Sequence, residues 1–353
     1  MRVGREGVKW VRLLALLCVL VGMDAGSTPA ANESAPAGPG LQAEQVAVVV
    51  NDEDANSAAV ANYYRQARHI PEKNVVHVRI PHSPRKLNVA DFNALKQQIE
   101  ANLGPEIQAI VLVWTAPYSV ECNSITAALT LGFDAEQCKN TCAPGKPSPY
   151  FNSNSRQPYT DLGIRISMLL PTDSLERAKS LINRGVLSEF RLQPASAYFL
   201  ITADRQRNTR ARFFPPSGKI PRLQFQIKTL RMNEISGQQD IMIYQTGLAS
   251  VPKLDTLGFL PGALADHLTS SGGDLLGSQQ MSSLRWLDAG ATASYGTVSE
   301  PCNHWQKFPH PLVLLRRYLA GETAIEAYWK SLAWPMQGVV IGEPLAAPYH
   351  RQK

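Results

Sequence analysis

The stretch VAVVVNDEDANSAAVANYYRQARHIP (46–71) sets the fold class, because it encodes a buried strand followed directly by a helix. Residues 46–50 are all apolar and mostly β-branched, which is typical of a strand covered on both faces of a parallel sheet. Apolar side chains then recur at helical spacing from 55 to 70, and Pro71 ends the helix.

The same alternation continues along the chain, with a strand over 75–80, a helix over 89–103 and a strand over 107–113. Consecutive parallel strands need crossover helices, so this order predicts an α/β domain with a mostly parallel sheet and helices on both faces. Further strands are expected at 166–170, 197–202, 240–244, 290–298 and 338–341, and helices at 173–184, 281–289, 312–319 and 324–332.

Three stretches of sequence depart from this alternation of strands and helices. Residues 117–160 form a long loop that holds three cysteines, and its length indicates a segment that is functional or pinned. Residues 203–240 show no clear periodicity. Residues 257–271 are interpreted as a short apolar segment that ends in polar residues.

The N-terminus has the pattern of an export signal. Basic residues in the first twelve positions precede the apolar run LLALLCVLVGM (13–23) and then small residues. We expect a signal peptide over 1–30, a Pro/Gly/Ala spacer over 31–42 and a single domain over 43–350, with an alternative subdivision near 205–240. The protein is therefore predicted to be exported by a bacterium, to the periplasm or the extracellular space.

The apolar run is too short to remain as a membrane anchor, since a spanning helix needs about 20 apolar residues. No stable membrane span is expected after cleavage. A lipoprotein is the alternative, but Leu17 precedes Cys18, where a small residue would be needed.

The charge pattern argues against nucleic-acid binding. The net charge of +6 is mild, and part of it belongs to the leader. The only basic run in the domain is short, and a nucleic-acid groove needs a concentrated stripe. The partner remains open on sequence grounds.

Four cysteines remain after cleavage: Cys122, Cys138, Cys142 and Cys302. An even number in an exported protein favours disulfides, and four cysteines allow three pairings. One of these closes a small loop between Cys138 and Cys142 and leaves a long-range Cys122–Cys302 link. A zinc site is a weaker alternative, because no companion His or Cys pair lies near the Cys-x₃-Cys spacing.

Three segments resemble an uncharacterised family of bacterial exported proteins: 48–75, WLDAGATASYGTVSEP (286–301) and GETAIEAYWKSLAWPMQGVVIGEPLAAP (321–348). That family is distantly similar to the gingipain and caspase class of cysteine peptidases. The resemblance implies a three-layer caspase/gingipain-like architecture. Its shared layout is a strand ending in Tyr-x-Gly-His-Gly, a strand ending in the nucleophilic Cys, a Gly-Ala strand and a closing Gly-Asp-Pro.

The peptidase dyad of that class is missing at the matching positions. The strand that reaches Tyr244 continues as Gln-Thr-Gly-Leu without a His, and 257–264 contain no Cys. The Gly-Ala strand matches 289–298, and the closing turn matches at 342–344 with Glu343 in place of Asp. The resemblance therefore implies a scaffold without peptidase activity, and we predict binding rather than proteolysis. A surface or assembly component is a further alternative.

Two groups of residues could support a divergent hydrolase instead. Cys302, His304 and Glu300 follow a predicted strand, where they could act as nucleophile, base and orienting carboxylate. The alternative is that Cys302 is half of a disulfide. His304 is also awkwardly placed, because residues two apart on an extended strand are separated by about 7 Å.

The second group is Asp266 and His267, followed by the hydroxyls of 269–271. The alternative is an ordinary polar loop, because adjacent residues in a strand point to opposite faces.

No metal or cofactor is predicted. The run 51–54 (NDED) could hold a hard cation, but its position favours capping of the following helix. The sequence has no glycine-rich nucleotide motif, P-loop or Gly-x-Ser-x-Gly elbow. The tryptophans could form a carbohydrate surface, although Trp286 and Trp329 fall in apolar helical patterns and are predicted to be core.

Overall fold

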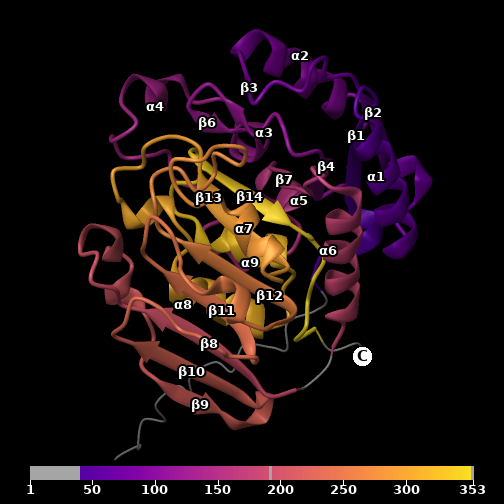
Figure 1. The fold of residues 1–353 in the computed structure, drawn as a ribbon. Helices are drawn as coiled ribbons and strands as arrows, with labels where there is room; N and C mark the ends of the chain where they lie inside the picture. The colour runs from indigo at the N-terminus through magenta and orange to yellow at the C-terminus, as the bar shows by residue number, and fades with distance from the viewer. Residues whose placement is uncertain (1–39, 191–192, 351–353) are drawn as a thin grey trace, which may run out of the picture. The chain divides into compact units, whose positions relative to one another are not determined.

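The computed structural model describes residues 40–190 and 193–350, and the predicted signal peptide lies outside them. These residues form an 11-stranded sheet in the order β2-β1-β4-β7-β14-β13-β12-β11-β8-β10-β9 (Figure 1). The strands in chain order are β1 (Val46–Asn51), β2 (Val75–Val78), β4 (Ala109–Val113), β7 (Ile166–Leu169), β8 (Ala195–Leu200), β9 (Gly218–Ile220), β10 (Phe225–Leu230), β11 (Ile241–Thr246), β12 (Phe259–His267), β13 (Ala293–Thr297) and β14 (Gly338–Gly342).

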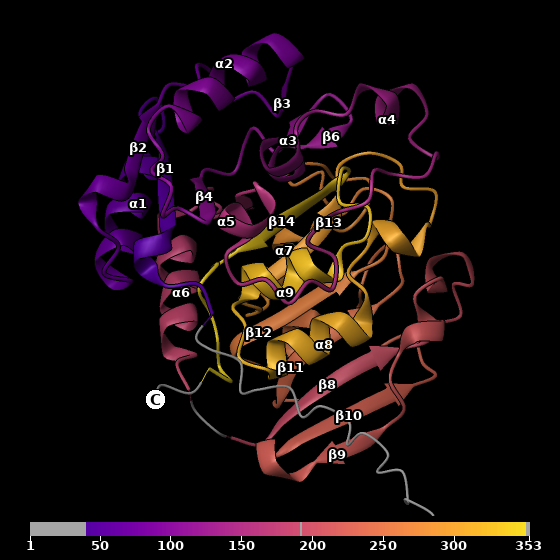
Figure 2. The same cartoon turned by 180° about the vertical axis from the view of Figure 1, so that it is seen from behind.

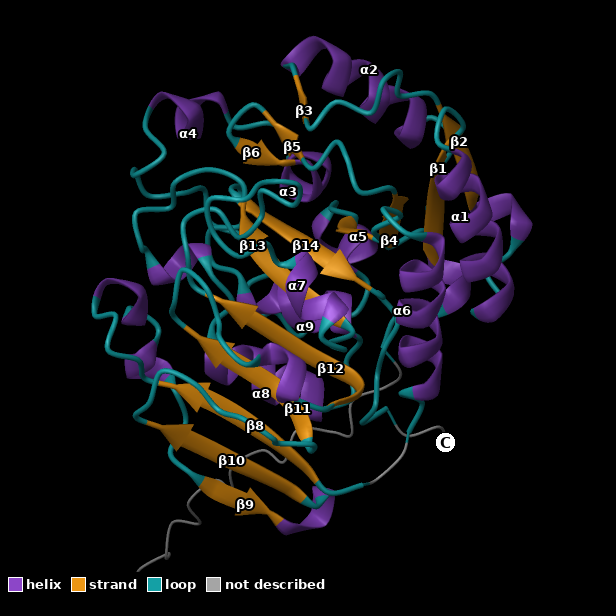
Figure 3. Ribbon diagram, in the orientation of Figure 1, coloured by secondary structure: helices purple, strands orange, loops and turns teal. Residues whose placement is uncertain are grey.

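The sheet consists of two parallel halves that run in opposite directions. The first half-sheet is β2-β1-β4-β7-β14 and the second is β13-β12-β11-β8-β10. They meet at the antiparallel pair β13–β14, and the arrowheads of β12 and β14 point in opposite directions in Figure 3. β9 adds an antiparallel edge strand. The carboxyl ends of the two half-sheets therefore lie at opposite edges, called here the first edge and the second edge.

Helices cover both faces of the sheet. Figure 1 shows α6 (Leu175–Leu187) and α7 (Leu284–Asp288) on the near face, and Figure 2 shows α8 (Pro311–Leu319) and α9 (Ala324–Ser331) on the opposite face. The remaining α-helices are α1 (Ala55–Ala67), α2 (Val89–Glu100), α3 (Ile125–Leu131), α4 (Ala135–Lys139) and α5 (Pro158–Leu162). The mostly parallel, three-layer α/β architecture predicted from the sequence is confirmed.

Short 3-10 helices join several of these elements: Ala43–Gln45, Glu72–Asn74, Gln206–Asn208, Ala211–Phe213, Pro221–Leu223, Leu254–Thr256 and Trp305–Lys307. Within 40–190 and 193–350, no helix is both long enough and apolar enough to span a bilayer.

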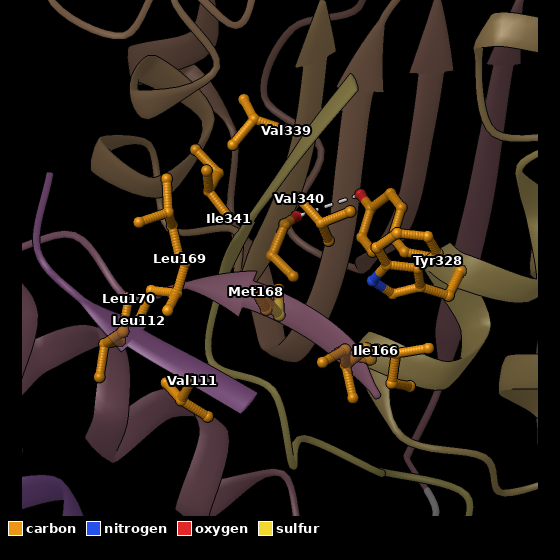
Figure 4. Packing of buried hydrophobic residues seen from close by; sticks show 14 of the residues in the cluster. Val111, Leu112, Ile166, Met168, Leu169, Leu170, Tyr328, Val339, Val340 and Ile341 are labelled. Atoms are coloured by element: carbon orange, nitrogen blue, oxygen red, sulfur yellow. Dashed lines mark hydrogen bonds between the residues drawn. The ribbon is translucent and has the colours of Figure 1, made fainter. Parts of the chain in front are cut away.

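The core is continuous across β4, β7 and β14, and α9 packs against β7 (Figure 4). Trp329 of α9 is fully buried and its indole Nε1–H donates to the carbonyl of Ser167 on β7 at 2.8 Å. Trp286 on α7 is equally buried. Both tryptophans are core residues, as predicted.

The segment 117–160 is more ordered than predicted. Besides α3, α4 and α5 it contains β5 (Ser119–Val120) and β6 (Asn123–Ser124), which form a small second sheet with β3 (Lys86–Leu87). The segment 203–240 supplies β9 and β10. These strands are short or partly exposed, so their sequences lack the long apolar runs that identify central strands.

β12 differs most from the expectation. It spans nine residues and continues through Asp266 and His267, whereas the sequence indicated only a short apolar segment followed by polar residues. Conversely, α7 covers only five of the residues predicted for its helix. A strand can carry a buried carboxylate and imidazole only if both are hydrogen-bonded, and the partners responsible are described next.

Candidate functional site

Both candidate groups lie at the second edge of the sheet. Asp266 and His267 end β12, and the loop after β13 carries Glu300, Cys302 and His304. Ligand sites in α/β sheets commonly form outside the carboxyl ends of strands, so this edge is where the geometry has to be tested.

Asp266 is part of a buried ion pair. Its Oδ1 accepts from Arg210 Nη1 at 2.5 Å and its Oδ2 accepts from Gln245 Nε2 at 2.9 Å. Both charged side chains are almost completely inaccessible, with 0% of Asp266 and 1% of Arg210 exposed. Burial raises the pKa of Asp266, and the nearby guanidinium opposes that effect.

Arg210 links three segments around this carboxylate. Its guanidinium also donates to the carbonyl of Thr246 at the end of β11 and to the carbonyl of Pro309 in the loop before α8. The Asp266 carboxylate therefore fixes a loop against the sheet. Neither carboxylate oxygen is presented to solvent.

His267 is held in a neutral state by two internal partners. Trp286 Nε1 donates to His267 Nδ1 at 2.9 Å, so His267 Nε2 carries the proton and donates to the carbonyl of Met281 at 3.1 Å. The ring is fully buried, and burial lowers its pKa to about 3. Asp266 and His267 use partners from different elements and do not contact each other through their side chains, as expected for neighbours in a strand.

Cys302 is oxidised. The disulfides are Cys122–Cys138 and Cys142–Cys302, which is a different pairing from the one with a Cys138–Cys142 loop considered above. Cys138 lies on α4 and its sulfur is bonded to Cys122, so it is not available to close the short loop with Cys142. Two disulfides indicate an oxidising, extracytoplasmic compartment.

The neighbours of Cys302 are also engaged. Glu300 Oε1 accepts from the backbone N–H of Cys302 at 2.7 Å, and His304 Nε2 lies 3.0 Å from the carbonyl of Cys142. Because the sulfur is bonded to Cys142, no thiolate is available to His304. The structure brings the three residues into one loop without a nucleophile–base contact.

The segment 117–160 packs over the second edge. Tyr118 donates to Asp274 in the loop after β12, and Ser299 Oγ donates to the carbonyl of Cys122 at 2.7 Å. Lys307 Nζ donates to the carbonyl of Thr141 at 2.5 Å, and burial lowers the pKa of this amine to about 8. These contacts and the Cys142–Cys302 disulfide fasten the segment across the ends of β12 and β13.

The loop after β12 fills the space beside those strand ends. Thr269 is fully buried, accepts from Arg207 Nε at 3.1 Å and donates to Gln280 Oε1 at 2.7 Å. A Cβ atom on Gly296 of β13 would lie 2.3 Å from the carbonyl carbon of Gly272. Only glycine allows the loop to approach the strand this closely.

At the first edge, the run 51–54 makes contacts that suit helix capping. Asp54 accepts from the N–H of Asn56 at 2.9 Å and from the Thr172 hydroxyl at 3.1 Å, and Asp52 lies 2.7 Å from His77. Within the described part of the chain, no three His, Cys, Asp or Glu residues are arranged to hold a metal ion.

Sequence reasoning did not identify Arg210 or Lys307. Arg210 belongs to a short basic run whose other members are partly or fully exposed, and nothing in the local pattern shows that it alone turns inward. Lys307 ends the short 3-10 helix Trp305–Lys307. Neither residue is marked by a local sequence signal, because the partners that hold them, such as Asp266 for Arg210 and Thr141 for Lys307, are distant in the chain.

Comparisons with known proteins concern the fold. No family model and no curated protein matches the chain. A solved structure described as the Arg-specific cysteine proteinase gingipain R (RgpB) matches with a TM-score of 0.46 and 12% identity, over 88% of this chain and 80% of that one. A structure titled "Structure of Protease" gives 0.44 and 10%, over 88% and 79%. The complex of Porphyromonas gingivalis RgpB pro- and mature domains gives 0.40 and 11%, over 86% and 79%. Likenesses at this level transfer no activity to this chain.

Proposed function

We propose that this protein is an exported binding protein that works in the periplasm or outside the cell without hydrolytic activity. The observation that carries the proposal is the state of the second edge. Asp266 and His267 are fully buried and bonded to internal partners, and Cys302 is half of a disulfide. A catalytic group must reach a substrate atom within hydrogen-bond distance, directly or through one water.

The buried state of these groups supports structural roles. A buried carboxylate with a guanidinium partner, and a neutral imidazole between an indole donor and a carbonyl acceptor, satisfy the rule that interior polar groups are paired. The divergent-hydrolase alternative would need Asp266, His267 or Cys302 to leave these partners and become accessible at the same edge.

The test is a hydrolysis screen of the protein recovered from the periplasm. A mixed panel of fluorogenic peptides and esters is incubated with the wild type, with His267→Gln and with the Cys142→Ala/Cys302→Ala double variant. We expect all three to show the same background rate. Hydrolysis by the wild type that disappears in either variant would overturn the proposal.

A further inference from the structure

Residues 140–149, called here the strap, lie against the loop that follows β13 at the second edge and contain no helix or strand. Both ends of the strap are anchored, because Cys138 is bonded to Cys122 and Tyr150 is fully buried. Most residues between these anchors are exposed. Segments that are exposed and lack regular structure open locally at a lower cost in free energy than core strands and helices.

The strap covers two side chains of the body of the domain. Gly145 lies directly on Trp334, since a Cβ atom at this glycine would be 2.7 Å from the tryptophan Cβ. The carbonyl of Thr141 accepts from Lys307 Nζ at 2.5 Å, and only 1% of Lys307 is exposed. Burial also lowers the pKa of this amine to about 8. Displacing the strap would therefore uncover Trp334 and Lys307.

One disulfide fastens the strap, and it is more accessible than the other. Cys142 is exposed and Cys302 is half-buried, so an external thiol can approach the bond. Both cysteines of Cys122–Cys138 are half-buried, and their sulfurs accept from the backbone N–H of Cys122 at 3.3 Å and from the Asn123 amide at 3.1 Å. Accessible disulfides belong to the labile, regulatory class, whereas protected ones resist reduction.

The backbone around Cys302 gives a second reason for reduction at this bond. Cys302 and Asn303 have φ values of 54° and 55°, in the left-handed region that residues other than glycine seldom adopt. Such conformations persist where the surrounding structure fixes them, and here the disulfide and a hydrogen bond from the Cys302 N–H to Glu300 do so. Opening the disulfide allows this backbone to relax, which favours the reduced form.

We propose that Cys142–Cys302 is a redox latch, which a dithiol opens to release the strap from the second edge. One thiolate of the dithiol attacks the Cys142 sulfur, and Cys302 leaves as a thiolate that takes up a proton. The second thiolate of the reductant then displaces Cys142 from the mixed disulfide, so that two electrons pass to the protein and the reductant becomes a disulfide. This inference adds regulation to the proposed binding role and rests on that role for its purpose, because release exposes Trp334 and Lys307 at the second edge.

A redox titration of the wild type tests the latch. The protein is equilibrated with reduced and oxidised dithiothreitol at increasing ratios, quenched with iodoacetamide and mapped by mass spectrometry. We expect Cys142–Cys302 to open at a ratio of reduced to oxidised reagent that is about ten-fold lower, or more, than the ratio needed for Cys122–Cys138.

Two measurements follow the strap at a ratio where Cys142–Cys302 alone is open. Hydrogen exchange over 140–149 should rise about ten-fold or more, because the Ser148 N–H then loses its bond to the carbonyl of Ala333. Acetylation of Lys307 should rise several-fold, while Lys73, whose side chain is 70% exposed, is the reference and should not change. β1 and β4 should stay protected from exchange, since the domain remains folded.

Variants separate the latch from the other disulfide. Cys142→Ala/Cys302→Ala should show the released strap without reductant, whereas Cys122→Ala/Cys138→Ala should keep the strap closed in oxidising buffer. The proposal fails if both disulfides open at the same ratio, if exchange over the strap is unchanged once Cys142–Cys302 is open, or if exchange rises through β1 and β4 as well. The titration of the wild type decides even where a variant does not fold. It involves no hydrolysis, so the latch and the proposed function can be judged separately.

Discussion

Replacing Arg210 by methionine removes the cation that compensates Asp266 at the second edge. Breaking a buried ion pair from one side leaves an uncompensated charge and costs about 3–5 kcal/mol. The two partners are 1% and 0% exposed, so water cannot take over the role of the guanidinium. We therefore expect Arg210→Met to lose an amount of folding free energy in this range, far more than a substitution at the surface.

The same loss of folding free energy corresponds to a decrease in the melting temperature. Unfolding entropy is about 2.1 cal/mol/K per residue, so a domain of about 310 residues should melt roughly 5–8 °C lower for this loss. Circular dichroism melts and urea titrations of the wild type and Arg210→Met measure it. Arg222→Met, at an exposed position, is the matched control and should change the melting temperature by less than about 1 °C.

The pH dependence gives an independent check. Burial already raises the pKa of Asp266, and loss of Arg210 should raise it further. A carboxyl whose folded pKa exceeds its unfolded value destabilises the fold above the unfolded pKa, and that penalty shrinks as the pH falls. The deficit of Arg210→Met should therefore narrow towards pH 4, and Asp266→Asn in the same background should recover part of it. A variant within about 1 kcal/mol of the wild type at neutral pH would refute this reasoning.

Three further predictions follow from buried or crowded positions. The folded pKa of His267 is about 3, well below the usual value near 6.5, so between these values the unfolded chain takes up a proton at this residue and the folded protein does not. Stability should therefore fall as the pH falls through this range, and His267→Gln should remove a pH slope of up to about 1.4 kcal/mol per unit in urea titrations. Removing the Cys142–Cys302 disulfide, which spans 160 residues, should cost roughly 5 kcal/mol in the same titrations by the loop-entropy relation. Gly296→Ala should cost about 1–3 kcal/mol, because its Cβ would clash with the loop after β12, whereas Gly218→Ala meets open space and should be neutral.

Each of these predictions has a contrary outcome. Equal pH slopes for the wild type and His267→Gln would mean that the ring titrates normally and is accessible. A disulfide variant as stable as the wild type would show that the segment 117–160 is not fastened through Cys302. Equal stabilities of the two glycine variants would remove the close packing inferred for the second edge.

The central strands could be predicted from the sequence because their side chains are buried on both faces. β1 and β4 appear as unbroken apolar runs, and the helices between strands carry clear apolar spacing and caps, such as Asp54 before α1. The patterns that identify these strands and helices lie within each segment of sequence, so they can be recognised without knowing which segments contact each other in the fold. The signal peptide stays a prediction.

The candidate site could not be predicted in the same way, because its chemistry depends on distant partners. Asp266 and His267 look accessible in the sequence, and only Arg210 and Trp286 show them to be internal. The reversal of strand direction between β13 and β14 is also a long-range feature, set by the last strand returning beside β7. That reversal separates the run 51–54 from the residues after β12, which sequence alone could not establish.

Disulfide mapping after alkylation of the native protein recovered from the periplasm tests most directly whether Cys302 is an oxidised, structural residue. The protein is treated with iodoacetamide without reductant, digested, and analysed by mass spectrometry. We predict crosslinked peptides that join Cys142 to Cys302 and Cys122 to Cys138, with no alkylated Cys302. Alkylation of Cys302 in the folded protein would contradict it, because a free thiol at the second edge would restore a nucleophile there.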